Sequence, residues 1–517
     1  MKKLATSLIA LGCAWAVVSA AAPAAADDYD LVILGGRVMD PESGLDAVRN
    51  VGVRGGKIAA ISEQPIQGKE TLDATGHVVA PGFIDGHTHV VDTPLGQKTM
   101  LRDGVTTQLD LEVGAWPVDY WYGRLDGKSQ ANYGATVSAI GARTKVLKPD
   151  YESKTGNVLQ DVDQVGMVWS TEIPSDDQID EVLKRVEEGL RQGALGVGSP
   201  VGYMTVGDTT REVIEEQRLA GKYGRFTSIH GRFSSQRTPT TGILGFQEAL
   251  SAAAVYGGGV LLCHFHAQSI GETHYAMEFV ADARKKGIKV QLEVYPYNFG
   301  ATIVGADYLH PDNYQKNMGR TYKDLILTQT GKPFTKEQYD ELVKTAPNTG
   351  IMFYHIKEEG MLEALAHPGV IVGSDAFPFV DPKTGKNVTN WDRPWGSWSA
   401  HPRAAGSHSR VLRLVREEKL KITLMHAISK MSLEYAQFLE DNGVPAMAGK
   451  GRVKIGADAD LTVFDPATVT DNATIPKGSL PATGIPFVVV NGTVVVKDSK
   501  VLKDVYPGEP IRLPVQR

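Results

Sequence analysis

Short apolar segments alternate with amphipathic segments between about residues 80 and 449. The stretch 177–192, for example, has the spacing of an amphipathic helix, and the apolar segment 194–198 that follows it has the length of a buried strand. Strands that alternate with helices over roughly 250 residues are typical of a (β/α)8 barrel. The pattern therefore predicts an α/β fold with a TIM-like barrel at residues 81–449.

Both ends of the chain show a different pattern, in which apolar strands are separated by tight turns. Gly55-Gly56 near the start and Asn491-Gly492 near the end are typical hairpin turns between such strands. We therefore expect residues 27–80 and 450–517 to form one small β-sandwich domain. A polar stretch at about 306–350 is too long for an ordinary loop and predicts an insertion over the barrel mouth.

Residues 1–26 have the composition of a secretory signal peptide: a charged start, a short apolar centre and an Ala-rich end. This predicts cleavage after Ala26 and a periplasmic or secreted protein. The alternative, in which Cys13 is a lipoprotein attachment site, has a poor flanking motif. No other apolar run reaches the ~18 residues of a membrane span. After cleavage only Cys263 would remain, which excludes an intramolecular disulfide.

Composition limits the class of partner. The chain has 54 Lys and Arg against 60 Asp and Glu, a net charge of −6, and so lacks the basic surface typical of nucleic-acid binding. We therefore expect a small-molecule substrate; the oligomeric state is left open.

The segment from Val78 to His89 carries the most specific chemical signal. An apolar strand ends in Gly82-Phe-Ile-Asp-Gly-His87-Thr-His89, and two histidines one residue apart project from the same strand face. Active sites of barrel enzymes lie where the strands end. Two imidazoles at that rim predict a divalent metal site.

The chain resembles the amidohydrolase superfamily through this segment, and within it the N-acyl-D-amino-acid deacylases (D-aminoacylases). The supporting motifs are Gly193-Ala-Leu-Gly-Val-Gly-Ser-Pro-Val-Gly-Tyr203, Tyr295-Pro-Tyr297, Val370-Ile-Val-Gly-Ser-Asp375, His401-Pro-Arg403 and Gly449-Lys-Gly-Arg-Val-Lys-Ile-Gly-Ala-Asp-Ala-Asp-Leu461. The resemblance covers nearly all of the chain after residue 26. It implies metal-dependent hydrolysis of an N-acyl amide bond.

The resemblance also implies the metal ligands. They are His87 and His89 from the first strand, Glu112 in the loop after the second, His230 after the fifth and His264 after the sixth. The expected cofactor is Zn²⁺, as one or two ions, although other divalent metals remain possible. His266 competes with His264, and Asp110 competes with Glu112. Cys263 is interpreted as a small buried thiol.

Two positions depart from the pattern of the D-aminoacylases. Those enzymes commonly carry a cysteine where this chain has Glu112, and a lysine where it has His266. A carboxylate can bind or bridge divalent metals as a thiolate does. Glu112 is therefore the candidate bridging ligand, and the substrate contacts at His266 are in doubt. The sequence has no lysine at a position that would suggest a carbamylated lysine as the bridging ligand.

Asp375 follows the predicted eighth strand and is the candidate catalytic residue. The resemblance implies that it takes a proton from metal-bound water and returns it to the leaving nitrogen while hydroxide attacks the acyl carbonyl. Tyr295 is a candidate for stabilising the oxyanion. A substrate carboxylate needs a bidentate partner, for which Arg403 is the first candidate and Arg232 the second. Trp391, Trp395 and Trp398 either bind an apolar group or order their loop.

These observations favour an enzyme that hydrolyses N-acyl-(D-)amino acids or related N-acyl compounds. One alternative is an amidohydrolase of peptide-like, cyclic amide or lactone substrates, because one fold supports many reactions. Another is an inactive metal-binding scaffold, which would be expected to lack one of the five residues His87, His89, His230, His264 and Asp375. The sequence leaves the chirality of the substrate, its acyl length and the identity of the metal open.

Overall fold

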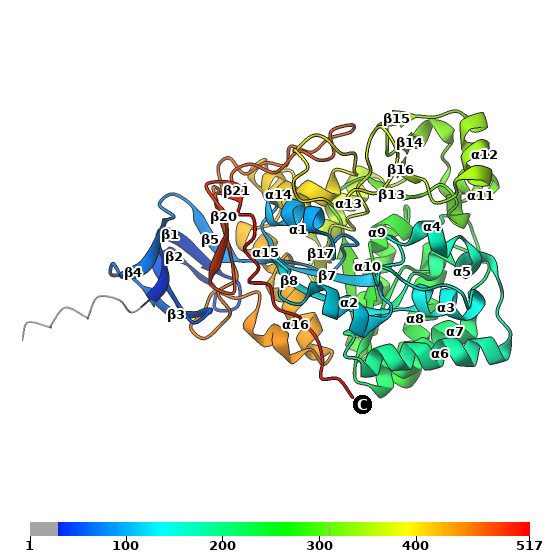
Figure 1. Ribbon diagram of the computed structural model, residues 1–517, viewed down its shortest axis with the longest axis horizontal. Coiled ribbons are helices and arrows are strands. Elements are labelled where there is room, and N and C mark those ends of the chain that lie inside the picture. The colour runs from blue at the N-terminus through cyan, green and yellow to red at the C-terminus, as the bar shows by residue number, and fades with distance from the viewer. Residues whose placement is uncertain (1–28, 310, 517) are drawn as a thin grey trace, which may run out of the picture.

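The computed structural model describes residues 29–309 and 311–516. Figure 1 shows a β-rich domain at one end of the molecule, a barrel surrounded by helices next to it, and a smaller lobe at the far end. The predicted cleavage site and Cys13 lie outside the described residues. Within those residues, no helix combines the length and the apolar character that a membrane span requires.

The barrel has eight parallel strands in sequential order, which confirms the predicted fold class. In order they are β6 (Phe83–Asp85), β7 (Val105–Ala115), β8 (Asn132–Ser138), β9 (Gly196–Ser199), β10 (Phe226–Ile229), β11 (Gly259–Leu262), β12 (Lys289–Val294) and β17 (Val370–Val372). The first and last strands meet at the rim, where Thr88 bridges to Ala376. Most strand residues are buried, because helices cover the outside of such a sheet.

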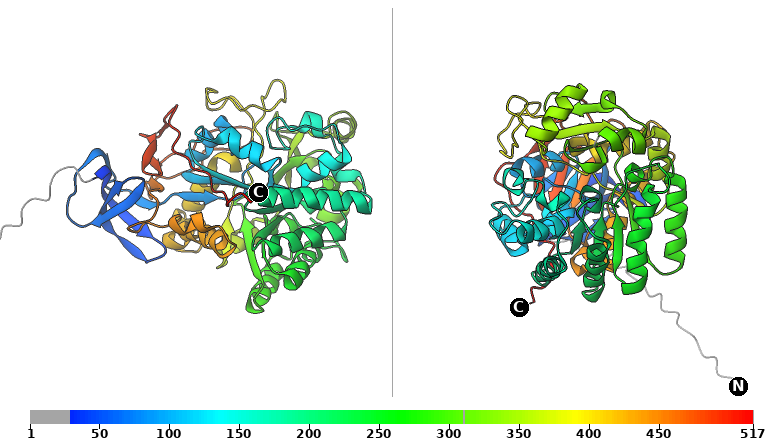
Figure 2. Two further views of the ribbon diagram at one scale, coloured as in Figure 1. Left: turned by 60° about the horizontal axis from the view of Figure 1, so that its bottom comes forward. Right: turned by 90° about the vertical axis from the view of Figure 1, so that its right-hand side faces the viewer.

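Helices alternate with these strands and surround them, as Figure 2 shows. The longer ones are α1 (Pro94–Leu101), α2 (Val118–Leu125), α3 (Ala139–Leu147), α6 (Asp176–Arg191), α7 (Thr210–Lys222), α8 (Gly242–Tyr256), α10 (Thr273–Lys285), α13 (Glu358–Ala366), α14 (Arg403–Arg416), α15 (Leu424–Lys430) and α16 (Leu433–Asp441). Shorter helices are α4 (Val162–Val165), α5 (Val168–Thr171) and α9 (Phe265–Gln268), and 3-10 turns are η1 (Val201–Tyr203) and η4 (Pro445–Gly449). The helix expected at 177–192 forms as α6, where Ser175 and Gln178 make a capping box.

Strands from both ends of the chain share one nine-stranded sheet. They are β1 (Tyr29–Asp40), β2 (Leu45–Arg54), β3 (Lys57–Ser62), β4 (Gly68–Asp73), β5 (Val78–Pro81), β18 (Leu461–Phe464), β19 (Phe487–Val490), β20 (Thr493–Lys497) and β21 (Lys500–Val501). The sheet joins the two ends where β18 pairs with β5. After β21 the chain returns to the barrel, and the backbone of Ile511 donates to Tyr133 of β8. Residues 507–516 thus lie along the barrel and not in the β-domain expected for 450–517.

The lobe at the far end is the insertion expected at about 306–350, but it begins earlier. It contains a four-stranded sheet formed by β13 (Phe299–Ile303), β16 (Gly350–Tyr354), β14 (Leu325–Leu327) and β15 (Lys332–Pro333). It also contains α11 (Pro311–Met318), α12 (Lys336–Thr345), η2 (Asp307–Leu309) and η3 (Tyr322–Asp324). The sequence concealed the early boundary because β13 is fully buried and resembles a barrel strand.

Candidate metal centre

The candidate histidine ligands converge at the ends of three barrel strands. His87 and His89 follow β6, His230 follows β10, and His264 follows β11. Their rings pack against one another: the His230 and His264 centroids are 4.7 Å apart, and those of His87 and His89 are 5.1 Å apart. All four side chains are almost completely buried. The parallel strands thus bring together residues that are up to 177 positions apart in the sequence.

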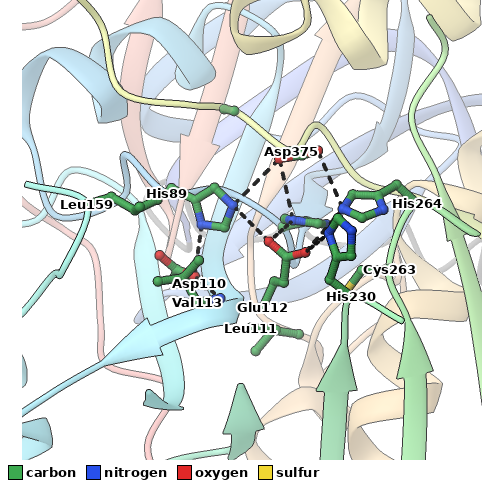
Figure 3. Close-up of polar contacts among 12 residues, drawn as sticks. His89, Asp110, Leu111, Glu112, Val113, Leu159, His230, Cys263, His264 and Asp375 are labelled. Carbon is green, nitrogen blue, oxygen red and sulfur yellow. Dashed lines mark hydrogen bonds and ion pairs between the residues drawn. The ribbon is translucent and has the colours of Figure 1, made fainter. Parts of the chain in front are cut away.

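Glu112 lies at the centre of this group, and each of its oxygens faces a different pair of histidines (Figure 3). Its Oε2 is 3.2 Å from His87 Nε2 and 3.3 Å from His89 Nε2. Its Oε1 is 3.1 Å from His264 Nε2 and 3.3 Å from His230 Nδ1. One carboxylate therefore bridges two pairs of imidazoles.

A bulge in β7 aims Glu112 inward. The pairing of β7 with β8 shifts between Asp110 and Ala115, so the four residues 111–114 of β7 oppose the single residue Thr136 of β8. The bulge contains Gly114, whose φ is +72°; a Cβ there would approach Thr136 Oγ1 to 2.5 Å. Such bulges redirect side chains near active sites. Glu112 therefore lies within the long second strand and not in the loop after it, where the sequence placed it.

Asp375 lies over both pairs of histidines. Its Oδ1 is 3.6 Å from both His87 Nε2 and His89 Nε2, and its Oδ2 is 3.7 Å from His264 Nε2. The backbone of Asp375 has a φ of +52°, and that of His264 a φ of +31°. Non-glycine residues in this left-handed region are held there by their surroundings, and such residues concentrate at functional sites.

A second layer of acidic side chains orients the histidines. His87 Nδ1 is 2.5 Å from Glu293 Oε2, and His89 Nδ1 is 3.1 Å from Asp110 Oδ1. Carboxylates that hold the outer nitrogen of a metal-binding histidine fix the tautomer and the orientation of the ring. The structure thus places Asp110 behind His89, whereas Glu112 occupies the centre. Glu293 was missed by sequence reasoning, although it is two residues before Tyr295 and shares its strand face.

The charges of the centre are complementary. Burial alone would raise the pKa of Glu112, but His87 and the hydrogen bonds of His230 and His264 bring that pKa well below its usual value. Burial would likewise raise the pKa of Asp375, and the positive charges of Arg403 and His87 lower it instead. Conversely, burial would lower the pKa of His87, but Glu293 and Asp375 raise it well above its usual value.

This donor set fits a divalent transition metal. His87, His89, Glu112 and Asp375 form one group, and Glu112, His230 and His264 form another, each with its ligand atoms within 4.8 Å of one another. Imidazole nitrogens together with carboxylate oxygens are the ligands of zinc in proteins. A third group of His87, Cys263 and Glu293 meets the same distance limit. Burial raises the pKa of the Cys263 thiol to about 12, which favours the interpretation of a buried thiol.

Of the remaining predicted residues, His266 and Arg403 lie beside the centre and Arg232 does not. The ring of His266 contacts that of Tyr295, with the centroids 4.6 Å apart, and lies outside the metal groups. Arg403 Nη2 is 2.8 Å from Asp375 Oδ1, and its guanidinium lies 4.7 Å from the centroid of Tyr295. Arg232 is held away from the site, because its Nε and Nη2 both donate to Glu248.

The three tryptophans order their loop. Lys98 of α1 lies 4.6 Å from the ring centroid of Trp391 and 5.0 Å from that of Trp395. Trp398 is buried and packs on Trp395 and Phe379. None of the three lines either of the two cavities that border the metal centre.

Comparisons with known proteins agree with this geometry, although no model of a known family matches the chain. It is 26% identical to the D-aminoacylase of Alcaligenes xylosoxydans xylosoxydans over 90% of this chain and 94% of that protein. It is 27% identical to the N-acyl-D-glutamate deacylase of the same organism, over 91% and 94%. The predicted resemblance to the D-aminoacylases is thereby confirmed.

Solved structures share the fold. The N-acyl-D-glutamate deacylase of Bordetella bronchiseptica, solved with zinc and a phosphonate that mimics the tetrahedral intermediate, superposes with a TM-score of 0.74 at 24% identity. The superposition covers 94% of this chain and 100% of that one. A D-aminoacylase structure superposes with a TM-score of 0.71 at 23% identity, covering 92% and 98%.

Proposed function

We propose that this protein is a metal-dependent amidohydrolase that cleaves the amide bond of N-acyl-D-amino acids and related N-acyl compounds. The observation that carries the proposal is the carboxylate of Glu112, shared between two pairs of buried histidines beneath Asp375. The names of the relatives supply the substrate class, because they are D-aminoacylase and N-acyl-D-glutamate deacylase.

The residues that would hold zinc are Glu112 together with His87 and His89 on one side and His230 and His264 on the other. When bound, zinc polarises a carbonyl oxygen and lowers the pKa of water at its coordination site. The related D-aminoacylase has a binuclear metal centre, in which one metal activates and a second attenuates. Because two groups of ligands share the carboxylate of Glu112, the site could hold one or two zinc ions.

Asp375 has the geometry of the proton carrier. Its Oδ1 is paired with Arg403 at 2.8 Å, whereas Oδ2 is 3.7 Å from His264 Nε2, so Oδ2 is the oxygen proposed to accept the proton. The lowered pKa of Asp375, caused by Arg403 and His87 against the effect of burial, keeps the side chain ionised, which a proton acceptor requires. It then donates that proton to the leaving nitrogen, because a carboxylic acid can act as base in one step and as acid in the next.

The substrate carboxylate is expected beside Tyr295 and Arg403. Among the described residues, Nε and Nη1 of Arg403 are buried without a hydrogen-bond partner, and Arg403 lies against the ring of Tyr295. A buried guanidinium with unused donors favours a carboxylate ligand. Arg232 is the weaker candidate, because Glu248 already neutralises it.

The test is the release of free amino acid from paired N-acetyl-D and N-acetyl-L substrates by the zinc-loaded protein. We expect release from the D series that stops when a chelator removes the metal. No release from either series, with zinc bound, would contradict the proposal and would favour a cyclic amide or an ester as substrate.

We also propose that the protein is exported, and the support is the composition of residues 1–26. The expected result is a mature protein that begins at Asp27 and is recovered with the periplasmic or extracellular fraction. Mass spectrometry of the purified protein measures its start directly. A chain that retains Met1 would contradict export through a cleaved signal.

A further inference from the structure

A cavity borders the metal centre at His89 and Glu112. Its walls are mainly apolar and come from three parts of the chain: the barrel strands and α3, the segment 158–169, and the insertion together with the loop after β17. They include Val113, Ile140, Val158, Leu159, Trp169 and Phe377. Gly166 is exposed and marks the side that opens to solvent.

A second cavity borders the centre at His230, His264 and Asp375. Its walls combine small and aromatic residues with polar side chains such as Tyr295 and His355. Tyr203 lines both cavities, so they meet at its ring. Figure 3 shows Leu159 beside His89, on the opposite side of the centre from His264. Two cavities therefore flank the centre: one beside His89 with almost purely apolar walls, and one beside Asp375 that also offers imidazole and phenol groups.

The chemistry of an N-acyl-amino acid matches this division. The carboxylate and the side chain both branch from the carbon attached to the amide nitrogen, whereas the acyl chain extends from the other end of the amide. When the carboxylate lies beside Tyr295 and Arg403, on the side of Asp375, the acyl chain would extend across the centre toward His89. On the basis of the proposed function, we propose that the apolar cavity is an acyl-chain site that selects substrates with medium-length apolar acyl groups.

The extent of the cavity supports more than an acetyl group. Its walls begin at His89 beside the metal centre and include Leu159, Trp169 and the exposed Gly166. The methyl group of an acetyl substrate would contact only the walls nearest His89, and a longer chain would contact the others as well. Because burial of each methylene is favourable, we expect kcat/KM to rise by about fourfold per added methylene until the cavity is full.

The experiment compares two substrate series on the zinc-loaded protein. In the first, D-alanine carries acetyl, butyryl, hexanoyl and octanoyl groups; in the second, N-acetyl is fixed and the side chain lengthens from D-alanine to D-norleucine. We expect kcat/KM to rise steeply along the acyl series and to change much less along the side-chain series. A steep rise with side-chain length alone would assign the cavity to the side chain and overturn the proposal.

A matched pair of variants locates the effect. Val158 is 3% exposed and lines the cavity, whereas Val255 is 72% exposed on α8. We expect Val158→Phe to fill the cavity and to reduce the octanoyl-to-acetyl ratio of kcat/KM by tenfold or more. Val255→Phe should keep the ratio of the native protein. An undiminished ratio in Val158→Phe would overturn the proposal.

A binding measurement separates this inference from the proposed function. Calorimetry with octanoate and acetate on the native protein and on both variants requires no hydrolysis. Tighter binding of octanoate that is lost only in Val158→Phe would support the acyl site even if no N-acyl-amino acid were hydrolysed. Hydrolysis of the acyl series at rates that do not depend on acyl length, together with equal binding of octanoate and acetate, would overturn the acyl site. The deacylase function would remain supported.

Discussion

Glu112 and Glu216 are both buried glutamates, at 1% and 3% exposure, yet their pKa values shift in opposite directions. Burial tends to raise the pKa of both. In Glu112 the charge of His87 and the hydrogen bonds of His230 and His264 outweigh it and bring the pKa well below its usual value. In Glu216 burial and the charge of Glu212 win, and the pKa rises to about 8.

The pKa values differ because the two carboxylates differ in the number of positively charged or hydrogen-bonding partners that they do not share with other acids. Glu112 has four imidazoles around it, whereas Glu216 on α7 shares Arg143 and Arg232 with other acids. Arg143 pairs with Glu212, and Arg232 pairs with Glu248. Burial therefore does not decide the charge of a carboxylate. An ionised carboxylate can hold a metal or accept a proton, whereas a protonated one can do neither.

The substitution with the largest expected effect removes the charge of Asp375, the other ionised carboxylate of the centre. We expect Asp375→Asn to lower kcat by about 10³-fold, because an amide cannot carry the proton from water to the leaving nitrogen. Zinc content, measured by mass spectrometry, should stay close to that of the native protein. An unchanged kcat would rule out the proton-transfer role.

A smaller effect is expected from Glu293, which supports His87 from behind. Glu293→Gln should weaken zinc binding by about 10- to 100-fold, because the histidine loses the carboxylate that orients it. Competition with a chromophoric chelator measures this affinity. Glu216→Gln is the matched control, a buried glutamate outside the centre, and should bind zinc as the native protein does. Equal weakening in both variants would indicate general destabilisation instead.

The smallest expected effect concerns the pH dependence of stability. Glu216 has a folded pKa of about 8 against a usual value of 4.5, so unfolding releases its proton between these values. Stability contributed by this group is therefore present below about pH 4.5 and is lost as the pH rises toward 8. Glu216→Gln should remove that loss, and should be more stable than the native protein by about 1–2 kcal/mol at pH 9.

The measurement for Glu216 is urea unfolding at pH 5 and at pH 9. The advantage of Glu216→Gln over the native protein should be larger at pH 9. If the variant is less stable at pH 9 by the same amount as at pH 5, Glu216 is ionised in the folded protein and the contrast with Glu112 fails.

Much of the centre could be predicted because motif residues that follow parallel strands must meet at one rim. His87, His89, His230, His264 and Asp375 each follow a strand whose apolar run is clear in the sequence. The choice between His264 and His266 and between Glu112 and Asp110 required the structure. The left-handed backbone conformation of His264 and the bulge around Glu112 set the directions of these side chains. The simple alternation of side chains between the two faces of a strand does not predict them.

The parts that escaped prediction lie in segments without periodicity. Val158, Leu159 and Trp169 come from a region of turns and four-residue helices, whose positions are set by packing against the barrel and the insertion. The final segment 507–516 also lacks a pattern, because its backbone pairs with barrel residues far away in the sequence. The local sequence pattern does not predict contacts of this kind, because they depend on residues far away in the chain.

The central claim is that Glu112 is the shared ligand of a hydrolytic metal centre. The most direct test is a zinc titration of the metal-free native protein and of metal-free Glu112→Gln. Release of amino acid from an N-acyl-D-amino acid is followed during the titration. The account predicts that the native protein gains activity as zinc binds, and that Glu112→Gln, folded by circular dichroism, binds zinc more weakly and stays inactive. If Glu112→Gln bound zinc as tightly as the native protein and gained the same activity, the claim would be wrong.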